Sequence, residues 1–168
     1  MCSVGKLSER ALEIALAEMA AGAREIGGNN RGPWVRKYLA LCGLPEGNPW
    51  CAAFVSWCYV EAAKSLGMQR AFKPIAGAKR VYAAAKKAGG ARDQAHDAEP
   101  GDIICWTRGG ANAATGHVGM VHHIDDECVI HTIEGNKTSR VALFKHPLVE
   151  PGRIGIARVD DPALVAKP

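Results

Sequence analysis

The sequence predicts an α+β fold in which N-terminal helices pack on a central antiparallel β-sheet of roughly 5–6 strands. Apolar residues recur at helical spacing in the first half of the 168-residue chain, and the second half holds short apolar segments separated by turn residues. This length suits one compact domain. We therefore expect a single domain over residues 1–168, with a helical front over about 8–90 and a sheet over about 100–160.

Helix signals are clear along the first half of the chain. Ser8 is a suitable N-cap, and Pro33 stands where proline favours the first helical turn. A long apolar segment begins at Cys51 and stops near a glycine, which is typical of a helix end. We expect helices over about 8–23, 33–42, 51–67 and 77–87.

In the second half of the chain, the hydrophobic pattern changes from the helical period to the short period of strands. Turn residues at 99–102 precede the first strand, and a glycine-rich loop at 108–116 precedes the second. The acidic segment 125–127 separates two strand segments that we expect to form a hairpin. The expected strands cover 102–107, 117–124, 128–134, 141–144 and 154–159.

Composition and charge limit the class of protein. The chain is 48% hydrophobic and 23% charged, with a net charge of +4. This mild excess suits attraction to an anionic polymer, but it is too weak and too scattered to indicate nucleic acid. The N-terminus lacks the apolar core of a signal peptide, and no apolar run approaches the ~20 residues of a membrane span. We expect a monomer made in the cytoplasm without membrane insertion.

The cysteines do not form a metal or disulfide pattern. Cys42, Cys58, Cys105 and Cys128 stand among apolar residues, where a free thiol behaves as a small hydrophobe. No close-spaced pair of cysteines is present, so we expect neither a structural zinc site nor another cofactor.

Cys51 differs from these four because of its place in the predicted helix. It lies in the first turn, directly after a proline-containing turn. There the helix dipole and the unpaired backbone N–H groups favour an anion and lower a thiol pKa. The same N–H groups can stabilise the oxyanion of a tetrahedral intermediate. We therefore predict that Cys51 is a nucleophile, the alternative being a buried core cysteine.

His117 is the histidine best placed to serve as the base for Cys51. It opens a strand after the flexible loop, and histidine titrates near neutral pH. The expected hairpin register places His117 opposite Glu134, Gly135 or Asn136. A polar side chain there can hold the second ring nitrogen and fix its tautomer. For the other histidines we expect structural or surface roles: His96, His122, His123, His131 and His146.

Substrate-binding residues are harder to choose from the sequence. Trp50, Trp57 and Trp106 can line a sugar or peptide groove, or they can belong to the core. A side chain that completes the oxyanion hole could come from Glu25, Asn30 or Asn48. The candidate substrate-binding residues are therefore Trp50, Trp106, Asn30 and Asn48.

A set of short motifs between Glu25 and Val159 resembles the CHAP domains, relatives of the NlpC-type and papain-like cysteine hydrolases. The motifs are Asn30-Arg31-Gly32, the segment Pro49 to Val55, Pro100 to Ile103, Gly116 to Gly119 and Glu134-Gly135-Asn136. The resemblance implies a papain-like fold and a single CHAP-like catalytic domain that cleaves peptidoglycan. It implies Cys51 as nucleophile, His117 as base, Glu134 as its orienting partner and Asn136 as a supporting site residue.

Several functions remain open on this basis. The enzyme would be an N-acetylmuramoyl-L-alanine amidase or a peptidoglycan endopeptidase. It would act on the wall or in the periplasm after release as a phage lysin, or after delivery by secretion machinery as an effector with an immunity protein. One alternative is a catalytically silent wall-binding or interaction domain with the same fold. A zinc protein that uses Cys51 and His117 is another, which the ligand spacing disfavours.

Overall fold

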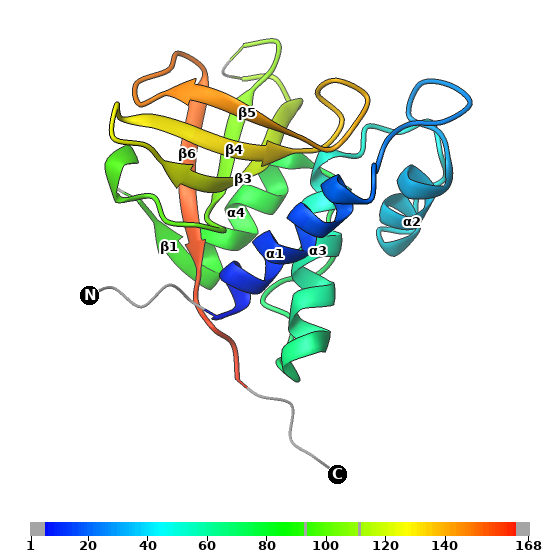
Figure 1. Ribbon diagram of the computed structural model, residues 1–168, viewed down its shortest axis with the longest axis horizontal. Helices are drawn as coiled ribbons and strands as arrows, with labels where there is room; N and C mark the ends of the chain where they lie inside the picture. The colour runs from blue at the N-terminus through cyan, green and yellow to red at the C-terminus, as the bar shows by residue number, and fades with distance from the viewer. Residues whose placement is uncertain (1–5, 93, 111, 164–168) are drawn as a thin grey trace.

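The computed structural model describes residues 6–92, 94–110 and 112–163 (Figure 1). Its helices are α1 (Lys6–Ala20), α2 (Pro33–Leu41), α3 (Cys51–Leu66) and α4 (Ala78–Ala88), with a short 3-10 helix at Ala95–Asp97. Its strands are β1 (Gly89–Ala91), β2 (Ile103–Thr107), β3 (Gly116–Ile124), β4 (Val129–Glu134), β5 (Ala142–Pro147) and β6 (Arg153–Val159).

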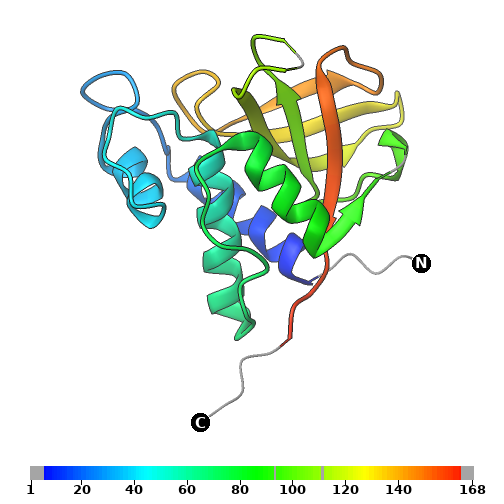
Figure 2. The same ribbon diagram turned by 180° about the vertical axis from the view of Figure 1, so that it is seen from behind.

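The strands form one antiparallel sheet in the order β1-β6-β2-β3-β4-β5. The sheet is strongly twisted, so that β4 and β5 cross β6 at a steep angle in Figure 1. Helices α3 and α4 pack on the sheet, α1 packs against α3, and α2 lies beside the start of α3 (Figures 1 and 2). The predicted α+β architecture, with helices followed by an antiparallel sheet, is confirmed.

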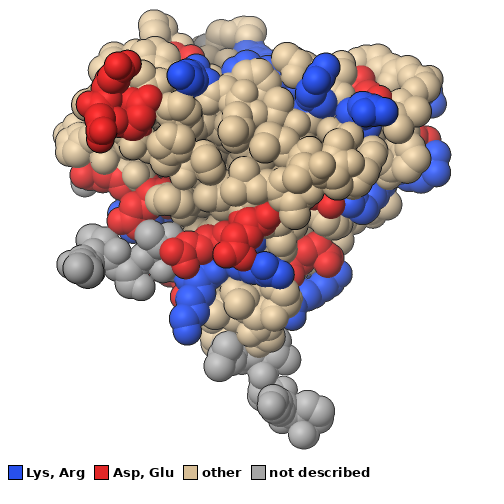
Figure 3. All heavy atoms as spheres, viewed as in Figure 1, with Lys and Arg blue, Asp and Glu red and all other residues tan. Residues whose placement is uncertain are grey.

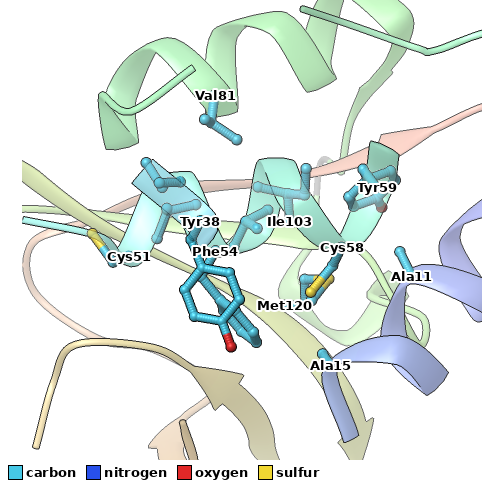
Figure 4. Close-up of a cluster of buried hydrophobic side chains, with 14 of the residues drawn as sticks. Ala11, Ala15, Tyr38, Cys51, Phe54, Cys58, Tyr59, Val81, Ile103 and Met120 are labelled. Atoms are coloured by element: carbon cyan, nitrogen blue, oxygen red, sulfur yellow. The ribbon is translucent and has the colours of Figure 1, made fainter. Parts of the chain in front are cut away.

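Alternation along the strands gives the sheet two apolar faces. The face that meets the helices belongs to the main core, which includes Phe54, Val81 and Met120 (Figure 4). The opposite face carries a smaller cluster: Ile104, Trp106, Val121, Ile130 and Ile156. The polar residues of the candidate site lie next to this second cluster.

Three local details differ from the sequence-based expectations. Helix α1 ends at Ala20, because Gly22 has a left-handed backbone (φ 85°) and the helix cannot continue. Strand β1 was not expected, since two of its three residues are glycines with no β propensity. Cys128 is exposed in the hairpin turn with φ 60°, so it is not the small buried hydrophobe that its apolar sequence neighbours suggested.

Charged side chains on the face seen in Figure 3 lie in small groups of both signs around a broad uncharged area. This view agrees with the scattered charge read from the sequence. None of the described helices combines the length and apolarity that a membrane span requires.

Candidate active site

Cys51 is the first residue of α3, where the helix leaves its N–H groups unpaired. Trp50 occupies the cap position, and its side chain makes no capping hydrogen bond. Figure 4 shows Cys51 at the open end of the helix, whereas Cys58 lies deeper, beside α1. The positive end of the helix dipole is therefore directed at the Cys51 thiol.

The start of α3 is fixed by the Trp50 ring, which is fully buried. The ring stacks on Tyr38 at a centroid distance of 5.7 Å, and its Nε1 donates to Glu25 Oε1 at 2.9 Å. A Cβ on Gly135 would lie 2.7 Å from Trp50 Cζ3, so the glycine lets the chain after β4 approach this ring. Trp50 is consequently a core residue that anchors the helix, and its expected place in a substrate groove is wrong.

His117 lies near the start of β3, directly opposite Trp106 on β2. It is 4% exposed. Its Nε2 is 2.7 Å from Glu134 Oε2, while its Nδ1 is buried and forms no geometrically acceptable hydrogen bond within the described part of the chain. Nδ1 is therefore the ring nitrogen that is available to the Cys51 thiol. Hydrogen bonds between catalytic groups are often long before substrate binds.

Electrostatics couple Cys51 to His117. Burial raises the Cys51 pKa, but the interaction with His117, the backbone N–H of Val118 and the charge of Arg108 lower it overall. Burial lowers the His117 pKa, but Cys51 and Glu134 raise it overall. Both shifts favour a thiolate beside an imidazolium.

The other core thiols show the opposite behaviour. Burial raises the pKa of Cys42 and Cys58, and it raises the pKa of Cys105 to about 12. These thiols stay protonated and unreactive at neutral pH. Cys51 is thus distinguished from them by its surroundings.

Glu134, the last residue of β4, is fully buried. Burial raises its pKa, but hydrogen bonds from His117, His146 and Thr132 lower it well below the ordinary range. Thr132 Oγ1 donates to Glu134 Oε1 at 2.6 Å, and Lys137 Nζ is 3.4 Å from Oε2. Glu134 therefore stays ionised and holds the His117 ring by its second nitrogen.

Gly119 makes the contact between Glu134 and His117 geometrically feasible. The hairpin register pairs Met120 with Ile133, and its continuation sets Glu134 opposite Gly119, so Glu134 reaches His117 diagonally. A Cβ on Gly119 would lie 2.7 Å from Glu134 Cγ. The glycine thus leaves the space through which the carboxylate passes.

Asn136 lies in the β4–β5 connection with a left-handed backbone (φ 71°). It is half-buried, and its side chain makes no hydrogen bond to any described residue. The carboxylate of Glu134, rather than this amide, contacts His117.

A pocket of about 450 Å³ opens beside Cys51. Small residues form most of its wall, and Arg108 supplies its charge; the lining is Pro49, Cys51, Ala76, Gly77, Ala78, Arg108, Ala114, Thr115 and Gly116. It lies between the start of α3, the segment before α4 and the loop before β3. This pocket is where a substrate would meet the thiol.

The polar candidates before α3 lie outside this lining. Asn48 Nδ2 donates to Pro45 O at 3.0 Å, and the Asn30 carbonyl accepts from the Gly47 N–H. Glu25 accepts the hydrogen bond of the Trp50 indole N–H through Oε1. Asn30 and Asn48 therefore shape the turn that leads to Cys51.

Trp106 is also a core residue, 7% exposed, and its expected place in a substrate groove is wrong. Its ring centroid lies 5.8 Å from that of His117 and 4.5 Å from that of His146. Its indole Nε1 donates to Glu150 Oε2 at 2.6 Å. Trp106 therefore packs against the rings of both His117 and His146.

The sequence analysis missed Thr132 and His146 as members of this network. Thr132 stands two residues before Glu134, and strand parity could have indicated that both face the same way. His146 was expected to have a structural or surface role, yet it is buried and 2.7 Å from Glu134 Oε1. In the described residues, no group of three His, Cys, Asp or Glu side chains is arranged to hold a metal ion.

The comparisons with known proteins agree with this geometry. The family model of the CHAP domain matches residues 43–136, more than half of the chain. The solved structure of NlpC1 from Trichomonas vaginalis is similar with a TM-score of 0.53 at 18% identity, which indicates a shared fold. The match covers 95% of this chain and 46% of that one, so this chain spans less than half of that protein. A comparison with curated proteins gives no match.

Gly119→Ala tests the path of the Glu134 side chain. The new methyl group would displace the carboxylate from His117, so the pKa of His117 should fall. The measurement is an NMR titration of the His117 ring in a Cys51→Ala background, where no thiol titrates beside it. An unchanged titration in a folded Gly119→Ala protein would show that the carboxylate reaches the ring by another path.

Proposed function

Because the chain belongs to the CHAP domain family, we propose that it hydrolyses an amide bond of peptidoglycan with Cys51 as nucleophile. The observation that carries this proposal is the buried Cys51–His117–Glu134 arrangement, in which the thiol pKa is lowered and the imidazole pKa is raised. An ion pair of this kind supplies both a nucleophile and a proton donor.

The geometry supports a two-step acyl transfer. The Cys51 thiolate attacks the carbonyl carbon, and the first N–H groups of α3 lie where they can donate to the resulting oxyanion. His117 then gives its proton to the leaving amine, and a thioester remains on Cys51. Neutral His117 next takes a proton from water, the hydroxide attacks the thioester, and the carboxylic product leaves as the thiolate re-forms.

Glu134 keeps His117 in the tautomer that this cycle needs. Its carboxylate accepts a hydrogen bond from Nε2–H throughout, so Nδ1 carries the proton that moves between sulfur, leaving group and water. Its negative charge also stabilises the imidazolium state. We propose Glu134 as the third member of the catalytic group, with Asn136 in a supporting role.

The pocket beside Cys51 supports a peptide substrate with small and acidic residues. Its small wall residues leave room for an alanine-sized side chain, and Arg108 can bind a carboxylate bidentately. Stem peptides of peptidoglycan combine these features. The cleaved bond would be the amide between glycan and stem peptide, or a bond within the peptide or its cross-bridge. The biological setting that we propose is a phage lysin or a delivered antibacterial effector with an immunity partner.

Digestion of purified peptidoglycan tests the activity and identifies the bond together. We expect the protein to release fragments with new chemical termini. Mass spectrometry of these termini distinguishes an amidase from an endopeptidase. Cys51→Ala should abolish this release while the protein stays folded, since no thioester can form. The matched control is Cys58→Ala, which should keep the chemistry and lose about 2 kcal/mol or less of unfolding free energy through a small cavity.

Two outcomes would contradict the proposal. A Cys51→Ala protein that digests wall as fast as the parent would exclude Cys51 as the nucleophile. A folded parent protein that binds peptidoglycan but releases no cleaved fragments would instead indicate a silent wall-binding domain.

The pH dependence of hydrolysis separates Glu134 from Asn136. Activity should rise as Cys51 ionises and fall as His117 loses its proton. Glu134→Gln removes the charge that raises the His117 pKa, so the alkaline limb should move to lower pH. Asn136→Ala should leave that limb nearly unmoved with a milder loss of kcat. The reverse pattern would identify Asn136 as the orienting residue.

A further inference from the structure

His146 brings a second imidazole to the carboxylate that holds His117. It lies on β5 opposite Ile130 of β4, and it is 6% exposed. Strands β3, β4 and β5 lie side by side (Figure 1), and the pairing puts His146, Glu134 and His117 on the same face of the sheet. His146 therefore reaches the Glu134 carboxylate from the side opposite His117.

Both ring nitrogens of His146 meet carboxylates. Nε2 is 2.7 Å from Glu134 Oε1, and Nδ1 is 3.1 Å from both oxygens of Glu150. Ionised carboxylates only accept hydrogen bonds, so both nitrogens must carry protons. The contacts thus describe an imidazolium, in agreement with its pKa, which burial lowers but Glu134 and Glu150 raise overall.

The groups around His146 complete a closed network. Glu150 also accepts from the indole of Trp106, whose ring lies against that of His146. Lys137 Nζ lies 3.4 Å from Oε2 of the same Glu134 carboxylate; it is also 3.5 Å from His146 Nε2, but a protonated nitrogen cannot accept from the lysine. Besides His117, two cations therefore face Glu134, namely His146 and Lys137. A second carboxylate, that of Glu150 in the β5–β6 turn, faces His146.

We propose that His146 is a positioning residue that, as an imidazolium held by Glu150, fixes the Glu134 carboxylate and offsets part of its charge. It thereby sets the pH at which His117 gives up its proton. The functional consequence rests on the proposed Cys–His mechanism, but the titration of His117 can be measured without any hydrolysis. A carboxylate shared with a second cation stabilises an imidazolium less than an unshared one does, and the second cation also repels it.

His146→Gln separates the charge of His146 from its hydrogen bond. The glutamine amide can still donate to Glu134, but it carries no charge. The ring of His117, followed by NMR in the Cys51→Ala background, should therefore titrate at higher pH than in the parent. In the Cys51 protein, the alkaline limb of hydrolysis should move upwards in the same way. Glu150→Gln should move both in the same direction, because His146 then loses the partner that keeps it charged.

His131→Gln is the matched control. His131 also donates to a carboxylate, Asp125 Oδ2 at 2.8 Å, but it lies at the far end of the hairpin. This variant should leave the His117 titration unchanged. If His146→Gln also leaves it unchanged, or if His146 itself is neutral at pH about 7, the proposal is overturned and His146 is only structural. If the parent protein cleaves no peptidoglycan, the proposed function fails, and the NMR titration still decides the role of His146.

Discussion

A fully buried carboxylate, that of Glu134, is the constraint around which the candidate site is built. An unpaired charge at such a position would cost several kcal/mol, so the surrounding strands must supply donors. They do so from three directions, through His117 on β3, Thr132 on β4 and His146 on β5. The hydrogen bonds that keep Glu134 ionised therefore also orient the histidine beside the thiol.

Two close approaches of the backbone bring this carboxylate and the helix together. Gly119 leaves the space that Glu134 crosses to reach His117, and Gly135 lets the chain after β4 lie against Trp50 at the start of α3. Trp50 is held in the core by Tyr38 and Glu25. The first turn of α3 therefore lies next to the start of β3 and the end of β4. The Cys51 thiol therefore lies at the positive end of the α3 dipole, close to the His117 imidazole and at the wall of the pocket.

Local rules were enough to predict part of this arrangement from the sequence. Helix-terminal position singled out Cys51, and hairpin register placed Glu134 near His117 within one or two residues. For Trp50 and Trp106 the sequence left a groove and the core both open, since aromatic residues alone do not distinguish a core from a binding surface. His146 could not be found in this way, because its place opposite Ile130 depends on how the β4–β5 connection folds.

The ionisation of Cys51 tests the central claim, a thiolate stabilised by His117, most directly. The measurement is the rate of Cys51 alkylation by iodoacetamide, located by mass spectrometry, from about pH 4 to about pH 10. The parent protein should react well below the pH at which an ordinary thiol ionises, near about 8.5. His117→Ala should move that rise to higher pH. Identical curves for the two proteins, rising where an ordinary thiol ionises, would contradict the account.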